Sequence, residues 1–374
     1  MKNKAIITAK PSQAKPSQAK LVALSLFSGG GGLDLGFSAA GFHVGCSSDL
    51  DTYSCETLIL NSGKKPFYSN AHSIPSDIRE VTATNLLKEA GLQKADVDIV
   101  IGGPPCQTFS IFGKRKGLDD PRGNLVWEYL RVIKEVQPKA FLFENVAGLK
   151  SIHNGSLYTK ILEDLSLDGT YTVSAHNYQV ADYGIPQFRD RIFFIGAKNG
   201  VAVPPMKPTH GDNTVNPYKT VADALRNLPE PTPNDPIPNH IGRNHSERIV
   251  ERYHKLAFGE RDPKTRINRL NPAKPSFTII VGSDKGGGKG HVHPLVPREV
   301  TPRESARIQT FPDWWEFHGK GRHVIRQVGN AVPPLFAALL AEHIRKHLFG
   351  KVSQKTYTDF IEILGLDFLI DERE

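Results

Sequence analysis

Short apolar runs alternate with amphipathic stretches over most of the chain from Leu21 onward. Five of these runs have the length of buried strands: residues 21–27, 42–49, 97–103, 139–146 and 191–196. Helical patterns lie between them, one of them directly after the glycines 29–32. Asp120 is placed to cap another helix with Pro121 in its first turn, and its apolar positions recur at helical spacing: Leu125, Val126, Tyr129, Val132, Ile133 and Val136. Strands that alternate with helices predict a doubly wound, mostly parallel α/β sheet.

The regular alternation is lost between residues 198 and 298. This stretch holds 14 of the 27 prolines, and nine Lys or Arg side chains lie within 241–274 against four acidic ones. A basic, loop-rich second domain and a set of insertions with a solvated charged face explain this composition equally well. After it, TPRESARIQTFPDWWEF (301–317) predicts a capped helix followed by an aromatic turn that serves as a scaffold. QVGNAVPP (327–334) predicts a rigid loop able to wall a pocket, with its double proline starting the last helix, over 333–349.

Composition narrows the class of protein. The first 20 residues contain KPSQA twice and predict a disordered cationic tail without the apolar segment of a secretory signal. No apolar run approaches the roughly 18–20 residues that span a bilayer, so a membrane span is not expected. Three cysteines, Cys46, Cys55 and Cys106, are too few for a disulfide framework or a four-ligand zinc site, so we expect a reducing compartment and no metal. The net charge of +8 is compatible with a polyanionic partner.

The turn after the first strand, FSGGGGLD (27–34), could let backbone approach a ligand at a helix N-terminus. Its glycine spacing does not match the dinucleotide fingerprint, which favours a less charged ligand than a pyrophosphate. Asp49 ends the next strand 20 positions after Gly29, where a ribose hydroxyl would accept a carboxylate. The alternative is a tight strand-to-helix connection with no ligand.

Cys106 lies in GGPPCQTFS, directly after the strand 97–103. Ligands of open α/β sheets bind beyond the carboxyl ends of the strands, which is where this cysteine is expected. A buried, inert thiol is the alternative. The glycine-rich and basic loop after it, 108–124, is predicted to be mobile and suited to closing over phosphates.

Charged side chains end two further strands. Glu144 follows the apolar run AFLF on a strand expected beside the cysteine strand, and partial burial there would raise its pKa and suit general-acid work. A carboxylate satisfied by backbone N–H groups is the alternative. Arg189 and Arg191, in QFRDR, are predicted to lie on one face of a strand entrance, where two guanidiniums could hold a phosphate or carboxylate.

Six segments in this order resemble the DNA cytosine-5 methyltransferases: FSGGGG, PPCQ, ENV, QFRDR, TPRESARIQTFP and GNAVPP. The resemblance runs from Leu21 to about Phe349. It does not include the tail, the basic middle region or the last 25 residues. It implies S-adenosylmethionine in the glycine-rich cleft, with Phe27, Ser28, Gly29 and Gly32 around the methionine part. It further implies that Asp49 takes the ribose hydroxyls, although the family commonly has Glu there, and that Leu50, Asp77 and Ile78 contact the adenine. Pro105, Asn330 and Val332 complete the implied cofactor contacts.

The resemblance also implies the chemistry. The Cys106 thiolate would attack carbon 6 of a flipped-out cytosine and make carbon 5 nucleophilic. Glu144, protonated, would donate to ring nitrogen 3, and Arg191 with Arg189 would hold the base oxygen or the adjacent phosphate. The basic region and the loop after Cys106 would offset the cost of flipping the base by contacting DNA.

These expectations define a domain plan and a set of alternatives. We predict a tail (1–20), a catalytic and cofactor-binding domain (21–197 plus 327–349), a target-recognition domain with its scaffold (198–326) and a C-terminal extension (350–374). The expected partner is a specific double-stranded DNA sequence, and a cognate restriction endonuclease could act on the same site. We expect the protein to be monomeric, cytoplasmic and associated with the nucleoid. A tRNA cytosine-5 methyltransferase with the same catalytic core and a non-catalytic DNA-binding protein of the same fold are the alternatives.

Overall fold

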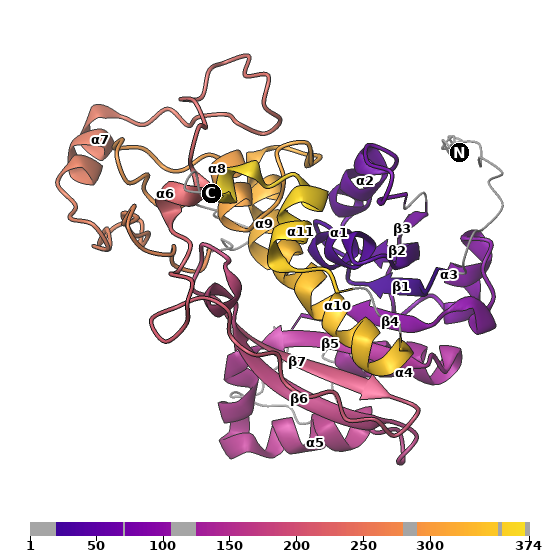
Figure 1. Cartoon of the computed structure of the whole chain (residues 1–374). Coiled ribbons are helices and arrows are strands. Elements are labelled where there is room, and N and C mark those ends of the chain that lie inside the picture. The colour runs from indigo at the N-terminus through magenta and orange to yellow at the C-terminus, as the bar shows by residue number, and fades with distance from the viewer. Residues whose placement is uncertain (1–19, 70–71, 106–124, 280–289, 351–353, 371–374) are drawn as a thin grey trace, which may run out of the picture.

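A seven-stranded sheet forms the centre of the protein (Figure 1). The computed structural model describes residues 20–69, 72–105, 125–279, 290–350 and 354–370. The strands are β1 (Val22–Leu26), β2 (His43–Asp49), β3 (Ser73–Pro75), β4 (Ile99–Gly102), β5 (Ala140–Val146), β6 (Thr172–Gln179) and β7 (Asp190–Ala197). They lie in the order β3-β2-β1-β4-β5-β7-β6, and β7 alone runs against its neighbours. The predicted doubly wound, mostly parallel α/β sheet is confirmed.

All five predicted strands are present within a few residues of their predicted ends. Two strands were missed. β3 is only three residues long, and β6 lies at the edge of the sheet, where several of its side chains are half-exposed and leave no clear apolar run. Length and apolar content therefore identified the central strands and not the outermost ones.

Helices cover both faces of the sheet. On one face lie α1 (Gly32–Ala39), α10 (Pro334–Phe349) and α11 (Tyr357–Leu364), and on the other α3 (Ala83–Glu89), α4 (Leu125–Val136) and α5 (Ser156–Leu165). The predicted helix over 125–136 is confirmed, with its apolar stripe buried, whereas its predicted cap, Asp120 with Pro121, lies outside the described residues. α2 (Thr52–Asn61) packs beside β2 and β3.

An N-terminal and a C-terminal segment of the chain meet where α1 packs against α10. A Cβ on Gly36 would lie 2.4 Å from the Cβ of Ala337 and 2.6 Å from the carbonyl oxygen of Pro334, so only glycine permits this approach. The run from Gly321 to Phe349 is long and apolar enough to cross a membrane by length and composition alone, yet 83% of its apolar stretch is buried inside the protein. Its apolar character is accounted for by the core.

The segment from residue 198 to 298 contains two short helices, α6 (Val221–Ala224) and α7 (Glu247–His254), and no named strand in its described part. It has a small apolar cluster of its own, formed by Tyr253, Leu256, Ile267 and Val292. Val203, Val221 and Leu270 instead join the main core below the sheet. Figure 1 shows α7 at the opposite end of the molecule from β1–β3. The domain boundaries remain a prediction.

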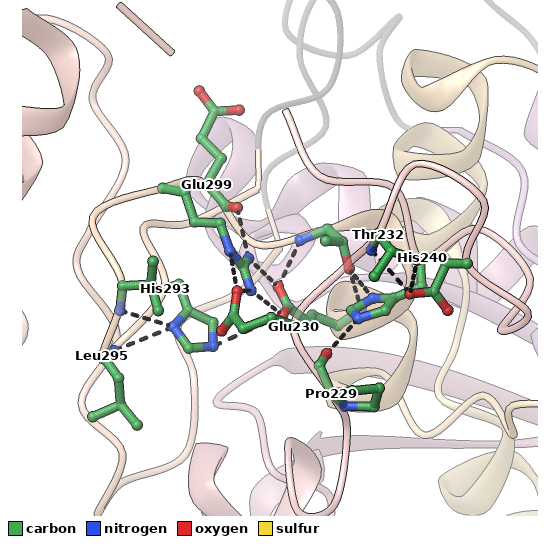
Figure 2. A network of polar contacts seen from close by, with 12 residues as sticks. Pro229, Glu230, Thr232, His240, His293, Leu295 and Glu299 are labelled. Carbon is green, nitrogen blue, oxygen red and sulfur yellow. Dashed lines mark hydrogen bonds and ion pairs between the residues drawn. The ribbon is translucent and has the colours of Figure 1, made fainter. Parts of the chain in front are cut away.

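A network of polar contacts joins this segment to α8 (Pro302–Ile308). Arg298 donates to both carboxylate oxygens of Glu304, at 2.7 and 2.9 Å, and to Glu230 at 3.0 Å. His240 connects Pro229 with Thr301, which caps α8 together with Glu304 (Figure 2). The capped helix predicted from TPRES is therefore confirmed, and its cap also holds three segments of the preceding region together.

Two predictions about the C-terminal part were wrong. Gly329 and Asn330 are the last residues of α9 (Gly321–Asn330), so only Ala331–Pro333 form the loop before α10. α10 is not the last helix either, because α11 and a short 3-10 helix (Asp367–Leu369) follow and bury apolar side chains in the main core. Further 3-10 helices cover Lys94–Asp96, Ala147–Gly155 and Val180–Tyr183.

Candidate active site

A cavity of about 950 Å³ opens at the carboxyl ends of β1, β2, β4 and β5. Its wall contains every described residue that the sequence singled out for binding or catalysis: Phe27, Ser28, Gly29, Gly32, Asp49, Leu50, Asp77, Ile78, Pro105, Glu144, Arg189, Arg191, Asn330 and Val332. Cys106, the remaining predicted site residue, lies outside the described residues and directly follows Pro105. The parallel sheet thus collects side chains from four strand ends at one edge.

The glycine-rich turn forms one side of the cavity. Phe27, Gly29 and Gly31 all have positive φ, between 52° and 83°, so the chain turns sharply from β1 into α1. A Cβ on Gly32 would lie 2.0 Å from the carbonyl oxygen of Val332, which makes glycine obligatory there. The turn is therefore shaped both by its own conformation and by contact with the loop before α10.

Asp49 fastens this turn to the end of β2. Its two carboxylate oxygens accept hydrogen bonds from the backbone N–H groups of Gly29 and Asp51, each at 2.8 Å. Burial raises the pKa of Asp49 above its ordinary value. Each oxygen keeps a further lone pair for a ligand hydroxyl. The contact with Gly29 was not predicted from the sequence.

Leu50 and Asp77 lie at the outer part of the cavity. Leu50 is 68% exposed, an unusual position for a leucine at the wall of a cavity. Asp77 pairs with Arg79, whose side chain holds the pKa of that carboxyl below its usual range. An exposed apolar side chain and a paired acid at one rim suit a planar, partly polar ligand.

Glu144 and Arg191 form an ion pair at the inner end of the cavity, with Arg191 Nε 3.0 Å from Glu144 Oε1. Both side chains are largely buried, and they extend from the neighbouring antiparallel strands β5 and β7. The other oxygen of Glu144 faces Gly103, where a Cβ would lie 2.6 Å from Oε2. Among the described residues, the carboxylate is therefore held by a guanidinium.

Arg189 has different partners from Arg191. β7 begins at Asp190, so Arg189 lies just before the strand and Arg191 within it, and both arginines line the cavity. Arg189 is almost fully buried and donates to the carbonyl oxygens of Gly329 (2.9 Å) and Asn330 (3.4 Å). Burial lowers the pKa of Arg189 to about 9. Two carbonyls at the end of α9 thus anchor this guanidinium beside the cavity.

Asn145 is a site residue that sequence reasoning missed. Its buried side chain donates to the carbonyl oxygen of Pro104 at 3.2 Å, and so holds the segment that leads into Cys106. The available signal was its place in ENV, directly after Glu144 on the same strand. β5 therefore supplies both a carboxylate for the cavity and an anchor for the neighbouring loop.

Buried amides connect the walls of the cavity. Gln187 donates to Gln309, and Gln309 donates to the carbonyl oxygen of Ala331 at 2.5 Å. On the opposite side, Thr57 donates to Gln327 at 2.6 Å. These contacts fix α8, α9 and the loop before α10 relative to the sheet, because buried polar groups are costly to leave unpaired.

The two described cysteines are not candidates for nucleophilic chemistry. Cys46 and Cys55 are buried, and burial raises the pKa of each thiol to about 12. Within the described parts of the chain, no group of three or more His, Cys, Asp or Glu side chains could hold a metal ion. A nucleophilic cysteine, if the chain uses one, would be Cys106.

The basic region has an internal and an outward-facing set of side chains. Arg252 pairs with the buried Asp262 at 2.6 Å, Arg269 donates to three backbone carbonyls, and Arg243 pairs with Glu299. Six others are exposed: Arg248, Lys255, Arg261, Lys264, Arg266 and Lys274. Part of the positive charge thus stabilises the loops themselves.

Comparison with known proteins identifies a family for this chain. A family model described as C-5 cytosine-specific DNA methylase matches residues 21–346. The chain is 37% identical to the type II methyltransferase M1.HphI of Haemophilus parahaemolyticus over 345 residues, which cover 87% of each protein. It is 33% identical to the type II methyltransferase M.XorII of Xanthomonas oryzae pv. oryzae over 370 residues, 88% of this chain and 86% of that one.

Solved structures give the same picture. A DNA modification methyltransferase encoded within an E. coli prophage superposes with a TM-score of 0.69 at 28% identity, covering 89% of this chain and all of that one. The S. pombe Dnmt2 methyltransferase has the same fold, with a TM-score of 0.57 at 18% identity over 88% of this chain and 99% of that one.

Proposed function

The chain belongs to the C-5 cytosine-specific DNA methylase family, and from this premise we propose which of its residues carry out the methyl transfer. It is a DNA cytosine-5 methyltransferase, for which S-adenosylmethionine is the usual methyl donor. The tRNA and non-catalytic alternatives are not favoured, because the curated relatives are type II methyltransferases that match over most of both chains.

The cavity at the strand ends is the proposed cofactor site. Its volume of about 950 Å³ is within the range of small-molecule pockets, and the backbone turn at Gly29 admits a ligand close to the chain. The exposed Leu50 side chain would pack on an adenine, and the free lone pairs of Asp49 would accept the ribose hydroxyls. Bound there, S-adenosylmethionine supplies an electrophilic methyl group on its sulfonium.

Cys106 is the proposed nucleophile. Pro104, held by Asn145, and Gly103, packed on Glu144, position the chain immediately before this residue. The thiolate would form a bond to carbon 6 of cytosine and give carbon 5 the electron density to accept a methyl group. Loss of the carbon-5 proton and elimination of the thiolate would then restore the aromatic base.

Glu144 and Arg191 are proposed to manage the charge that develops on the ring. Attack at carbon 6 moves negative charge toward nitrogen 3, and a proton on Glu144 would neutralise it there. Arg191 engages Oε1 of Glu144, so Oε2 is the oxygen we assign to nitrogen 3. Arg191 would also donate to the oxygen on carbon 2. The carbonyl contacts of Arg189 support a role in positioning α9 beside the base.

Double-stranded DNA with a specific recognition sequence is the proposed substrate. The target cytosine must leave the duplex, because neither carbon 5 nor carbon 6 is accessible to this machinery inside the base stack. The exposed basic residues of 241–274 would contact phosphates and help to offset that cost. We further propose a monomeric, cytoplasmic enzyme that works at the nucleoid, alongside an endonuclease specific for the same site.

The ion pair between Glu144 and Arg191, beside the chain that leads into Cys106, carries this proposal. Its test is transfer of labelled methyl groups from S-adenosylmethionine to duplex DNA and to tRNA, with Cys106→Ala as the matched variant. We expect transfer to duplex DNA only, and none by the variant. Duplex DNA with 5-fluorocytosine at the target should trap a covalent adduct, because that ring has no carbon-5 proton to lose. Transfer by Cys106→Ala at the wild-type rate would overturn the nucleophile assignment.

A further inference from the structure

Asp34 is a fully buried carboxylate that the reaction described above does not use. It lies in the first turn of α1 and accepts a hydrogen bond from Ser25 on β1 and another from Ser47 on β2, both at 2.5 Å. Burying a carboxylate costs free energy even when it is hydrogen-bonded, and a neutral side chain would pack here at lower cost. Asp34 directly follows the glycine-rich turn, so its hydrogen bonds can affect the turn residues that line the cavity.

One of its two partners leads to the cavity. Ser25 Oγ has a single hydrogen, and that hydrogen is donated to Asp34 Oδ1 because an ionised carboxylate can only accept. Toward Ser28, Ser25 Oγ can therefore only accept, and Ser28 Oγ donates to it at 3.0 Å. Among the described residues, the other atoms within reach of Ser28 Oγ are the carbonyl oxygens of Ser25 (3.3 Å) and Ser48 (3.2 Å), which are also acceptors.

The hydrogen of Ser28 is consequently committed to the protein interior. Ser28 also lines the cavity, so its hydroxyl has only lone pairs to offer a ligand there. A hydroxyl that can only accept favours a cationic or N–H group as its partner. In S-adenosylmethionine the methionine part carries an α-ammonium, which fits this requirement.

We propose that Asp34 is a positioning residue for the cofactor: through Ser25 it fixes Ser28 as a hydrogen-bond acceptor for the α-ammonium group. This inference rests on the proposed placement of the cofactor in the cavity. Ser47 gives the structure its own control, because Ser47→Ala removes the second hydrogen bond to Asp34 and leaves the path through Ser25 to Ser28 intact.

The test measures inhibition constants of two ligands that compete with labelled cofactor. S-adenosylhomocysteine retains the ammonium group, and 5′-methylthioadenosine lacks the whole amino-acid part. We expect Asp34→Asn, Ser25→Ala and Ser28→Ala each to weaken S-adenosylhomocysteine binding about ten- to hundredfold, as for one hydrogen bond to a charged group. The same variants should bind 5′-methylthioadenosine within about twofold of wild type, and Ser47→Ala should bind both ligands normally.

Combining Asp34→Asn with Ser28→Ala should give no further loss beyond Ser28→Ala alone, because the two residues act through one contact. The inference would be overturned if the variants lost affinity equally for both ligands, or if Asp34→Asn bound S-adenosylhomocysteine as tightly as wild type. It would also be overturned if the losses added in the double variant, or if Ser47→Ala weakened binding as much as Asp34→Asn. Failure of the cofactor placement would look different, since substitutions at Asp49 and Leu50 would then also leave binding of both ligands unchanged.

Discussion

The carboxylate of Glu144 lies 3.0 Å from the guanidinium of Arg191, across the junction of two antiparallel strands. Because the two residues extend from adjacent strands of a rigid sheet, their spacing does not depend on a loop. The pair therefore places two groups of opposite charge at a fixed separation in the wall of the cavity.

Replacing Glu144 by Gln should reduce kcat by about 10²- to 10⁴-fold, the usual contribution of a proton donor. The amide keeps the shape and can still accept from Arg191, so duplex DNA should bind with unchanged affinity. Steady-state methylation rates and DNA titration would measure the two effects. Glu128→Gln is the control, since that residue pairs with Arg131 at 2.7 Å on α4 and lies outside the cavity wall. A Glu144→Gln enzyme within tenfold of the wild-type rate would rule out the assigned role.

Replacing Asn145 by Ala should slow the Cys106 step by about tenfold or more, because the carbonyl of Pro104 loses its anchor and displacements of about 1 Å are costly in catalysis. The rate of adduct formation on 5-fluorocytosine DNA isolates this step. Asn145→Asp, which keeps the shape but cannot donate when ionised, should be at least as slow. Affinity for the cofactor should change little, and full activity of the aspartate variant would contradict the anchoring role.

Replacing Asp34 by Asn should stabilise the folded protein at neutral pH, although it weakens binding of the cofactor. Burial raises the pKa of Asp34 from 3.8 to about 6, so the folded state holds this proton more tightly than the unfolded state. The contribution of Asp34 is favourable below pH 3.8 and is lost as the pH rises through about 6, a difference on the order of 3 kcal/mol. Denaturation between pH 4 and 7.5 should show the variant gaining on wild type as the pH rises. A constant difference across that range would refute this account.

Replacing Lys264 and Lys274 by Gln should weaken DNA binding in a salt-dependent way. Both side chains are exposed, and loss of two phosphate contacts should lower the slope of log Kobs against log salt concentration by about two. The double variant Lys88→Gln and Lys94→Gln changes the net charge equally, at exposed positions of α3 and the following 3-10 helix. Its slope should stay at the wild-type value, and equal losses in both variants would show a general effect of charge.

The apolar runs that predicted the sheet worked where the strands are buried on both faces. For AFLF before Glu144, the pattern and the environment coincide, since all four side chains are buried. β6 and α11 were missed because half-exposed edges and short appended helices leave a mixed pattern. The candidate site residues could be predicted from the sequence where a charged or nucleophilic residue type follows the end of a strand.

Contacts between distant segments could not be predicted in the same way. Nothing in QFRDR indicates that Arg189 would turn toward the carbonyls of Gly329 and Asn330, some 140 positions later. The hydrogen bond from Asn145 to Pro104 likewise depends on the register of β4 and β5. Only the packed structure determines which backbone atoms are available as partners.

The contact between Gly32 and Val332 bears on how the enzyme is made in the cell. A chain leaves the ribosome from its N-terminus, so the first wall of the cavity is synthesised about 300 residues before the loop that closes it. The cavity therefore cannot be completed until α10 has emerged and packed on α1. We therefore expect a nascent chain that already carries Glu144 and Arg191 to lack a finished cavity.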